Sequence, residues 1–329
     1  MTTLRWGILG PGRIAPRLVR AVAGTARAQL VAVASRDRDR AAAFAAAHEI
    51  PRIFGSYDAL LAAPDVDVVY VSLPNHLHAE WTIRALEAGK HVLCEKPIAL
   101  TVGQVDAMAA AAERAGRIAV EAFMYLHHPQ ILRAIELAQG GALGRLELVN
   151  ATFSFLLAHP HDPRVDPAMG GGSLWDVGCY PVSLARRIAG EEPARVGAFA
   201  RFDERGVDRT FIGQLHFPGG LLAQFDSGFA APDRERVEIV GGDATLVLES
   251  PFLPAPDGPP PSLMMWRGRD ASRIDVASID QYGAEVEDLT AAILDGTPPR
   301  INLAFSRGTI ATLVDLDRAA RGNAGPTGR

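Results

Sequence analysis

Cysteine is scarce in this sequence, with Cys94 and Cys179 as its only two among 329 residues. Two cysteines are too few for a disulfide framework or a structural zinc site, and so low a number is typical of reducing compartments. The N-terminal MTTLRWGILG lacks the basic and the long apolar segments of a secretory signal. No stretch approaches the ~18 consecutive apolar residues of a membrane span. These absences predict a cytoplasmic protein without a membrane segment.

Clustered positive charge is also missing. The formal net charge is −5, and lysine and arginine form no basic run. This argues against a nucleic-acid surface, whose affinity depends on clustered cations facing phosphates. The 48% hydrophobic and 22% charged residues are ordinary for a globular protein. At roughly 100–200 residues per domain, the length predicts two domains, each with its own core.

The first third of the chain alternates between strand-like and helix-like segments. The run VDVVYVSL (66–73) is continuously apolar, as in strands buried on both faces of a parallel sheet. Strands are predicted at 5–9, 29–34, 66–73, 91–94 and 118–121, and helices at 14–23, 38–48, 79–88 and 102–115. The alternation predicts a doubly wound parallel sheet, a Rossmann domain over residues 1–122.

Residues 123–322 follow a different pattern. Helices are predicted at 129–139, 172–188, 285–294 and 306–321, and strands at 146–157, 196–202, 210–217, 221–229, 236–240 and 244–248. Turn signals such as Pro218-Gly219-Gly220 separate the last five strands, and no crossover helix fits between them. The pattern predicts an α+β domain with a mostly antiparallel sheet. A proline-rich loop at 250–262 and a flexible tail at 323–329 complete the expected organisation.

The sequence Gly10-Pro11-Gly12-Arg13-Ile14-Ala15 follows the first strand and opens the first helix. It is the G-x-G-x-x-A form of the dinucleotide fingerprint. Gly10 permits the tight turn, Gly12 lets the backbone approach the pyrophosphate, and the helix N-terminus attracts the phosphates. Cofactor contacts are therefore predicted at Gly10, Gly12, Arg13 and Ile14. The alternative is a structural strand–helix turn without a ligand.

The end of the second strand bears on the choice of cofactor. NAD enzymes usually place an acidic residue about 20 residues beyond the glycines, on the ribose 2′-hydroxyl. Ser35 stands there instead, followed by Arg36 with Arg40 nearby, and these side chains suit a 2′-phosphate. NADP(H) is therefore predicted in preference to NAD(H). The alternative is that these charges, with Asp37 among them, only form the solvated start of a helix.

Two further loops follow strands whose carboxyl ends line the ligand crevice of such a sheet. The first is Leu73-Pro74-Asn75 with His78 after it, where cofactor contact and helix capping by Asn75 are equally good explanations. The second is Glu95-Lys96-Pro97, a charged pair that is natural at the mouth of a cleft. Lys96 is suited to hold a substrate oxygen or to lower the pKa of a neighbouring acid. A surface ion pair is the alternative.

A glycine-led motif in the second domain, GGGSLWDVGCYP (170–181), places Asp176 and Tyr180 at i and i+4 of one predicted helix. The two side chains are therefore expected on one face. Tyr180 offers a proton donor of intrinsic pKa near 10, which a nearby cation lowers toward neutral pH. Taken alone, the motif is only a helix with two polar residues.

Together these motifs resemble the Gfo/Idh/MocA oxidoreductase family. The matching segments, in family order, are WGILGPGRIA (6–15), LPNHLH (73–78), AGKHVLCEKP (88–97) and GGGSLWDVGCYP (170–181). Within the family the chain is most similar to the dimeric dihydrodiol dehydrogenase and NADP-dependent D-xylose dehydrogenase branch. The segments RVDP (164–167), EAFMY (121–125) and HP (128–129), together with tyrosine at position 180, carry that closer similarity.

The resemblance implies several properties that spacing alone does not. Lys96 matches the lysine that contacts substrate and nicotinamide ribose, and Asp176 and Tyr180 match the aspartate and the acid/base residue. The second domain is implied to be an open antiparallel sheet with helices on one face. The resemblance also implies that the exposed face of this sheet joins two copies of the chain in a homodimer. One departure is Leu126, where relatives often carry arginine, and it affects the substrate pocket.

The expected reaction is reversible hydride transfer between nicotinamide C4 and a carbinol or carbonyl carbon of a small sugar, polyol or cyclic diol. Tyr180 exchanges the hydroxyl proton, Lys96 stabilises the phenolate, and Asp176 binds a neighbouring hydroxyl or holds Lys96. Pocket residues are expected to include Phe153, Phe155, Arg164 and Trp175.

Three other functions fit parts of the sequence. Reduction of a keto-sugar or dicarbonyl uses the same residues in the opposite direction. A non-catalytic dinucleotide-binding regulator is an alternative from a different class of protein. The presence of Lys96, Asp176 and Tyr180 argues against it, because a regulator has no need of a proton donor. A metal-dependent hydrolase built on His76, His78, His127 and His128 is disfavoured, because neither histidine pair has the converging acidic or cysteine ligands of a metal site. No metal is therefore predicted.

Overall fold

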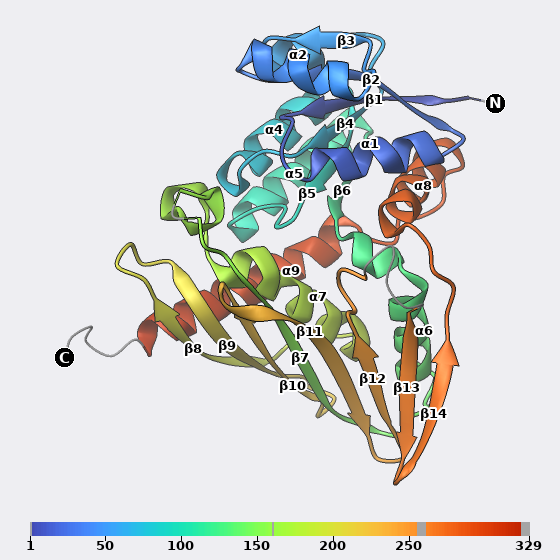
Figure 1. The fold of residues 1–329 in the computed structure, drawn as a ribbon, viewed down its shortest axis with the longest axis vertical. Helices are drawn as coiled ribbons and strands as arrows, with labels where there is room; N and C mark the ends of the chain where they lie inside the picture. Colours follow the sequence, from blue (N-terminus) through green and yellow to red (C-terminus); the bar gives the residue numbers. More distant parts are fainter. Residues whose placement is uncertain (1, 160, 255–260, 324–329) are drawn as a thin grey trace. The chain divides into compact units, whose positions relative to one another are not determined.

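The computed structural model describes residues 2–159, 161–254 and 261–323, and the chain divides into two compact units. The first unit consists of Met1–His127 together with Asp280–Arg307, and the second of His128–Ile279 together with Gly308–Arg329. Figure 1 shows the elements of both units in sequence colours. Among the described residues, no helix has the length and apolar character needed to cross a membrane.

The first unit is built on a six-stranded sheet of order β3-β2-β1-β4-β5-β6 in which every pairing is parallel. The strands are β1 Leu4–Leu9, β2 Ala28–Ala34, β3 Arg52–Phe54, β4 Val68–Val71, β5 His91–Glu95 and β6 Ala119–Ala122. This strand order is that of the Rossmann fold, and it confirms the predicted doubly wound sheet. The reversal between β1 and β4 is the point at which such sheets bind a ligand.

The helices of the first unit connect its strands or follow the last of them along the chain. They are α1 Ala15–Gly24, α2 Arg38–Ala47, α3 Tyr57–Leu61, α4 Asn75–Glu87, α5 Val102–Ala115, the short η1 Met124–His127 and α8 Gln281–Leu294. Helix α5 shows how the sequence sets their ends. Thr101 and Gln104 form a reciprocal capping box at its start, and Gly116 ends it in the left-handed region, at φ 59°.

The sequence prediction missed the short elements β3 and α3 and began α4 four residues late. Strand β3 has three residues and α3 has five, too few to show a period. Helix α4 starts at Asn75 because Pro74 occupies its N-cap position with extended backbone (ψ 147°). Asn75 therefore lies in the first turn of the helix and does not precede it.

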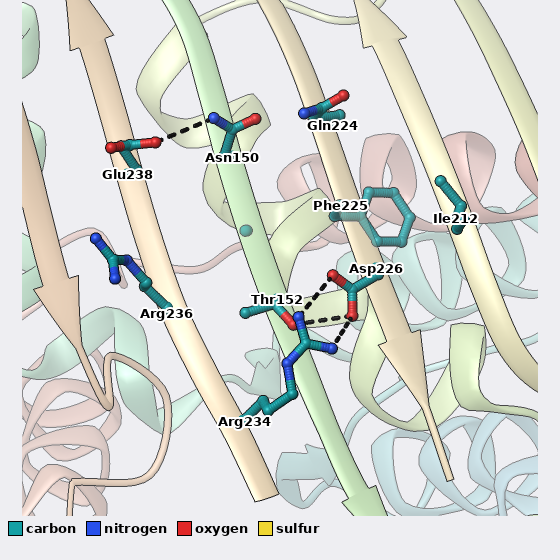
Figure 2. Close-up of a pocket in the computed structure, with 10 residues that line it drawn as sticks. Asn150, Thr152, Ile212, Gln224, Phe225, Asp226, Arg234, Arg236 and Glu238 are labelled. Carbon is teal, nitrogen blue, oxygen red and sulfur yellow. Dashed lines mark hydrogen bonds and ion pairs between the residues drawn. The ribbon is translucent and has the colours of Figure 1, made fainter. Parts of the chain in front are cut away.

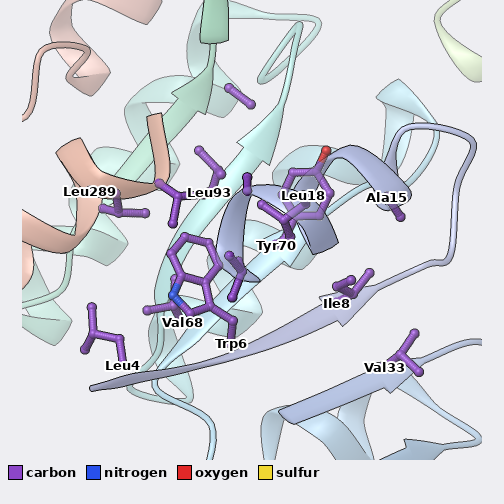
Figure 3. Packing of buried hydrophobic residues seen from close by; sticks show 14 of the residues in the cluster. Leu4, Trp6, Ile8, Ala15, Leu18, Val33, Val68, Tyr70, Leu93 and Leu289 are labelled. Atoms are coloured by element: carbon purple, nitrogen blue, oxygen red, sulfur yellow. The ribbon is translucent and has the colours of Figure 1, made fainter. Parts of the chain in front are cut away.

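The division into units also differs from the predicted domains, because α8 belongs to the first unit. Val286 and Leu289 of α8 are fully buried in the core that contains Trp6 and Leu93. Figure 3 shows Leu289 lying among the side chains of this core, beside Trp6 and Leu93. The chain thus returns to the Rossmann core after the second sheet, a long-range contact that local sequence patterns do not encode.

The second unit contains an eight-stranded sheet of order β14-β13-β12-β11-β7-β10-β9-β8. Its strands are β7 Leu146–Leu156, β8 Arg195–Phe202, β9 Asp208–His216, β10 Leu222–Gly228, β11 Ala230–Gly241, β12 Thr245–Glu249, β13 Ser262–Arg267 and β14 Asp270–Asp275. All neighbours are antiparallel except β7 and β10. The mostly antiparallel sheet was predicted, but β13 and β14 were not. Strand β14 (DASRID) is an exposed edge strand without an apolar face, so it carries no strand pattern.

Helices of the second unit are α6 Pro129–Gln139, α7 Cys179–Ala189 and the part of α9 (Leu303–Gly322) that follows residue 307. Short helical segments η2 Pro163–Val165, η3 Pro167–Met169 and η4 Leu174–Gly178 precede α7. Helix α7 contacts β7 and β10. Of the predicted tail, Asn323 donates its side-chain amide to the Ala198 carbonyl at 3.0 Å, and 324–329 lie outside the described residues. Residues 255–260 of the predicted proline-rich loop also lie outside them.

Candidate active site

The glycine turn joins β1 to α1 against the end of β4. Gly10 has φ +83°, and a Cβ there would lie 2.7 Å from Leu73 Cδ2. At Gly12 a Cβ would lie 3.1 Å from the Ser72 carbonyl oxygen, and Ser72 Oγ donates to the Gly10 oxygen at 2.5 Å. The positive φ favours glycine at Gly10, and a side chain at Gly12 would crowd the Ser72 carbonyl just beyond β4. The turn leads into α1, whose first helical residue, Ala15, is fully buried against the sheet. This is the close approach that the dinucleotide fingerprint requires.

Residues at the end of β2 lie beside the same turn. Arg40 of α2 donates from Nη2 to the Pro11 carbonyl at 2.9 Å, which holds its guanidinium at the glycine turn. Ser35 is buried, and its Oγ accepts from Asp37 N at 3.2 Å. Asp37 is the N-cap of α2, since its carboxylate accepts from Arg40 N at 3.0 Å. The carboxylate that complicated the sequence prediction thus caps a helix, while Arg36 remains exposed.

His78, a predicted cofactor contact, lies between two main-chain carbonyls. The imidazole is buried, with Nδ1 2.8 Å from the Pro97 oxygen and Nε2 2.7 Å from the Leu73 oxygen. Burial lowers the pKa of His78 below its ordinary value. Both ring nitrogens therefore face main-chain carbonyls, and His78 joins the turn after β4 to the turn after β5. Leu73, Pro74 and Asn75 occupy the first of these turns, and none of the three is fully exposed.

The second of these turns carries Glu95 and Lys96, both half-buried at the carboxyl end of β5. The Tyr70 hydroxyl donates to Glu95, and Lys96 N donates to Glu95 Oε2 at 3.3 Å. Burial, together with the negative charge of Glu95, raises the pKa of Tyr70 well above its ordinary value. Through this hydrogen bond Glu95 helps to hold the backbone from which the Lys96 side chain leaves the sheet.

In the second unit, Asp176 and Tyr180 lie on either side of a junction between two helix types. The predicted helix 172–188 begins as a π-helical turn, η4, and becomes α-helical at Cys179. Such turns occur frequently at functional sites. Tyr180 is 4% exposed, and its ring packs edge-on against Phe153 and tilted against Phe252, with centroids 5.2 and 5.5 Å away. Phe252 was not predicted, since the Pro-rich sequence around it shows no strand or helix pattern.

Of the predicted pocket residues, Arg164 and Trp175 lie beside Asp176, and Phe155 packs against Arg164. Trp175 is the half-buried neighbour of Asp176 in η4, and the Phe155 ring lies 5.2 Å beneath the guanidinium carbon of Arg164. Arg164 forms a bidentate ion pair with buried Asp162, at 2.9 and 3.0 Å, and its Nη1 lies 3.8 Å from Asp176 Oδ2. The hydrogen bond that Arg164 donates to Asp162 raises the pKa of Arg164 above its usual value.

Asp208 was missed by sequence analysis, although it fixes the start of η4. Its buried carboxylate accepts from Ser173 Oγ at 2.6 Å and from Leu174 N at 2.8 Å. A Cβ at Gly172 (φ +133°) would overlap the same carboxylate, so glycine is required there. Burial raises the pKa of Asp208 to about 6. Position 208 follows a surface turn and opens β9, so nothing local marked it as a partner of the glycine motif.

The raised pKa of Asp208 predicts a measurable pH effect on stability. Because the folded pKa of about 6 exceeds the ordinary value of 3.8, this group stabilises the fold below the unfolded pKa. That contribution is lost as pH rises through about 6. Asp208→Asn lacks the titrating group and does not lose this contribution. The unfolding free energy of the variant minus that of wild type should therefore rise by about 2 kcal/mol between pH 4.5 and pH 7.5. Urea unfolding at both pH values measures this, and parallel curves for the two proteins would contradict it.

The two histidine pairs of the disfavoured metal site have other partners. His127 Nε2 lies 3.4 Å from Asp288, and His128 is the N-cap of α6, where its Nδ1 accepts from Gln130 N at 3.2 Å. His76 is exposed on α4. Within 2–159, 161–254 and 261–323, no group of three or more His, Cys, Asp or Glu residues is arranged to hold a metal ion.

Two family models match the chain along most of its length. Residues 4–123 match the oxidoreductase family with an NAD-binding Rossmann fold, and residues 131–247 match the GFO/IDH/MocA C-terminal domain. With the six-stranded parallel sheet followed by the larger, mostly antiparallel one, these matches define the class of protein. The chain belongs to the Gfo/Idh/MocA oxidoreductase family, and it is an oxidoreductase with an NAD(P)-binding Rossmann fold.

Individual relatives resemble the whole chain or most of it. A D-xylose 1-dehydrogenase (NADP(+)) from Haloferax volcanii is 37% identical, over 94% of this chain and 95% of its own. A bovine trans-1,2-dihydrobenzene-1,2-diol dehydrogenase is 37% identical over 72% of each chain. The crystal structure of a 3-ketoreductase from Actinomadura kijaniata in complex with NADP and TDP-benzene is 32% identical, with a TM-score of 0.89 over 98% of both chains. The resemblance to the dihydrodiol and xylose dehydrogenase branch is thereby confirmed.

Proposed function

We propose that this protein is an NADP(H)-dependent oxidoreductase that interconverts a carbinol and a carbonyl in a small sugar, polyol or cyclic diol. The observation that carries the proposal is the setting of Tyr180. Its ring is fixed by Phe153 and Phe252, on a helix whose glycine-led start also carries Asp176. A buried phenol with a fixed ring is suited to exchange one proton at a defined place. The aldose and diol dehydrogenases among the relatives support this substrate class.

Each of the three proposed catalytic residues has one chemical role. Tyr180 takes the proton of the reacting hydroxyl during oxidation and returns it during reduction. Lys96 supplies positive charge that favours the tyrosinate and orients the reacting oxygen. Asp176 accepts a hydrogen bond from a neighbouring hydroxyl of the substrate. When bound, the nicotinamide accepts or donates the hydride at C4, and the residues of the chain position the reacting carbon.

The cofactor is held by the first unit in this proposal. Gly10 and Gly12 form the backbone cradle, with Arg13 and Ile14 leading into α1, whose N-terminus favours phosphate. Leu73, Pro74 and Asn75 line the turn after β4, and Glu95 and Lys96 the turn after β5. Ser35, Arg36 and Arg40 receive the 2′-phosphate, because Arg40 is already held at Pro11 and Asp37 is turned to its helix cap. NADP(H) is therefore preferred over NAD(H).

The variant Ser35→Asp tests this preference. A carboxylate at the end of β2 repels a 2′-phosphate and accepts from a 2′-hydroxyl. The ratio of kcat/KM for NADP⁺ to that for NAD⁺ should therefore fall by about 100-fold. This is the effect expected from the repulsion between two like charges in close contact. Steady-state kinetics with both cofactors on one substrate give the ratio. A wild-type enzyme with higher kcat/KM for NAD⁺ would refute the proposed preference outright.

Reduction of a keto-sugar is the second candidate activity. It is favoured by the likeness to the 3-ketoreductase, over nearly the full length of both chains. The same residues serve, with Tyr180 donating the proton to the new hydroxyl. Comparing kcat/KM for an aldose with NADP⁺ and for a keto-sugar with NADPH distinguishes the two directions.

We also propose that two copies associate through the open face of the second sheet. Figure 2 shows polar side chains along this face, including the pair of Arg234 with Asp226 at 3.0 Å. Phe199 and Ile212 lie opposite one another on the same face, and they are 65% and 50% exposed. Apolar side chains rimmed by charges are typical of protein interfaces. Light scattering of the purified protein should give the mass of a dimer, and a monomer at micromolar concentration would contradict it.

A further inference from the structure

A short segment that follows β12 supplies one of the two rings that pack against Tyr180. Strand β12 ends at Glu249, and Ser250 then adopts left-handed backbone, at φ 48°. This conformation is costly for a residue with a Cβ, so the surroundings must hold it. Two residues later, Phe252 is fully buried, with its ring stacked on Phe153 at 5.2 Å and tilted against Tyr180 at 5.5 Å. The place of the Tyr180 ring is therefore linked to the backbone of this segment.

Glu235 of β11 binds the same segment at three points. Its carboxylate oxygen Oε2 accepts from Phe252 N at 3.2 Å and from Leu253 N at 2.9 Å. Its main-chain oxygen accepts from Ser250 N at 3.2 Å. Because two successive amides donate to one oxygen, the backbone between them has little freedom to turn. Glu235 thus holds the chain from the left-handed residue through Phe252.

Glu235 also lies next to the aromatic residues themselves. In the pairing of β11 with β7, Glu235 stands directly opposite Phe153, whose ring packs against Tyr180. Side chains that oppose one another across two strands lie on the same face of the sheet. The preceding residue, Arg234, alternates to the open face, where it pairs with Asp226 at 3.0 Å. The Glu235 carboxylate is therefore directed to the face of the sheet that carries the aromatic cluster.

We propose that Glu235 is a positioning residue of the active site, which holds Phe252 against the Tyr180 ring and so fixes the place at which the phenol exchanges its proton. The inference rests on the proposed function, because it takes Tyr180 as the proton-transfer group. Glu235 acts through Phe252 and not on the substrate or the cofactor. This role requires an acceptor oxygen at position 235 but no negative charge, since an amide oxygen also accepts from two N–H groups.

The kinetics of two variants with D-xylose, as a representative aldose, and NADP⁺ test this role. Glu235→Ala should lower kcat about tenfold, the equivalent of one or two lost hydrogen bonds. Glu235→Gln should stay within about twofold of wild type, because its amide oxygen accepts both N–H groups. Should Glu235→Ala fail to fold, Glu235→Asp withdraws the carboxylate by one methylene and should lower kcat in the same direction. Equal activity of all these variants, or a loss in Glu235→Gln as large as that in Glu235→Ala, would overturn the role.

Glu191→Ala provides a matched control in the same unit. The Glu191 carboxylate accepts from Gly219 N at 2.7 Å, so it also holds a turn through a main-chain amide. That turn, 218–220, carries none of the aromatic residues around Tyr180. The control should keep kcat within about twofold of wild type. A loss as large as that of Glu235→Ala would mean that any loosened turn of this unit lowers activity, and it would contradict a specific role for Glu235.

A double-mutant cycle determines whether Glu235 acts through Phe252. Phe252→Ala removes the ring from Tyr180, so Glu235→Ala in that background has no ring left to position. The second substitution should then lower kcat by less than about twofold, because the two residues act on one interaction. A tenfold loss in both backgrounds would contradict the proposed route.

A spectroscopic measurement separates this inference from the proposed function. Tyr180 is one of five tyrosines, and the other four belong to the first unit, namely Tyr57, Tyr70, Tyr125 and Tyr282. ¹⁹F NMR of the full chain labelled with 3-fluorotyrosine gives the Tyr180 signal, identified by its absence from Tyr180→Phe. This signal should move in Glu235→Ala and in Phe252→Ala, because the adjacent Phe252 ring is displaced or lost, and keep its wild-type shift in Glu235→Gln. The four first-unit signals serve as internal references.

The two measurements together decide each claim on its own. A displaced Tyr180 signal in Glu235→Ala, without turnover of any aldose by wild type, supports the positioning role and refutes the proposed activity on aldoses. Turnover by wild type with an unmoved Tyr180 signal in Glu235→Ala overturns the positioning role and leaves the activity standing. An unmoved signal without turnover refutes both.

Discussion

Replacing Tyr180 by phenylalanine should lower kcat by about 10²- to 10⁴-fold, the contribution expected of a positioned general acid/base. The substitution removes only the hydroxyl, so the contacts of the ring with Phe153 and Phe252 persist. The Kd for NADPH should change little, because the proposed cofactor residues belong to the first unit. Steady-state kinetics and a fluorescence titration with NADPH measure the two quantities separately.

Tyr57→Phe is the control for this variant. Tyr57 is a buried tyrosine of α3 that packs edge-on against Trp81 in the first unit. Its loss of one hydroxyl should leave kcat within about twofold of wild type, as for a conservative change away from the reacting atoms. Undiminished turnover of Tyr180→Phe on a verified substrate would remove Tyr180 from the mechanism.

Replacing Lys96 by methionine should lower kcat/KM by about 10²- to 10³-fold, as when one preorganised electrostatic group is removed. The side chain leaves β5 from a turn held by Glu95 and by His78 through the Pro97 carbonyl. Methionine retains the length of lysine without its charge, so the loss is electrostatic. Lys90 is the only other lysine in the sequence, and it binds the Ala63 and Val66 carbonyls in the core.

The matched variant Lys96→Arg keeps the charge but changes the shape of the cationic group. A planar guanidinium cannot reproduce the point charge of an ammonium at a fixed position. Its kcat/KM should lie between those of wild type and Lys96→Met. Equal activity of wild type and Lys96→Met on the same substrate would exclude an electrostatic role for Lys96.

Much of the Rossmann unit could be predicted because its signals are local. A glycine turn between an apolar strand and a helix specifies both a conformation and a ligand class, and the alternation of strand-like and helix-like segments indicates a doubly wound parallel sheet. The helix containing Asp176 and Tyr180 was located by its glycines. The π-helical turn was not, since a single turn of different pitch leaves the apolar pattern almost unchanged.

The contacts that fix these residues were beyond the sequence. Asp208 accepts a hydrogen bond from Ser173, which lies 35 residues earlier in the sequence. Helix α8 packs into the Rossmann core although the whole second sheet separates the two in the sequence. Even the short-range pair of Asp162 with Arg164 was not predicted, because the bidentate geometry depends on the irregular η2 backbone. The sequence thus indicated which side chains carry chemistry, whereas the structure supplies the partners that orient them.

The most direct test of the proposed function is the formation of NADPH by the purified protein with a panel of aldoses, inositols and dihydrodiols, read by absorbance. We expect NADPH to form with at least one neutral aldose or diol, more efficiently than NADH forms from NAD⁺, and the rate to collapse in Tyr180→Phe. No hydride transfer with any member of the panel, or with keto-sugars in the reverse direction, would contradict the account.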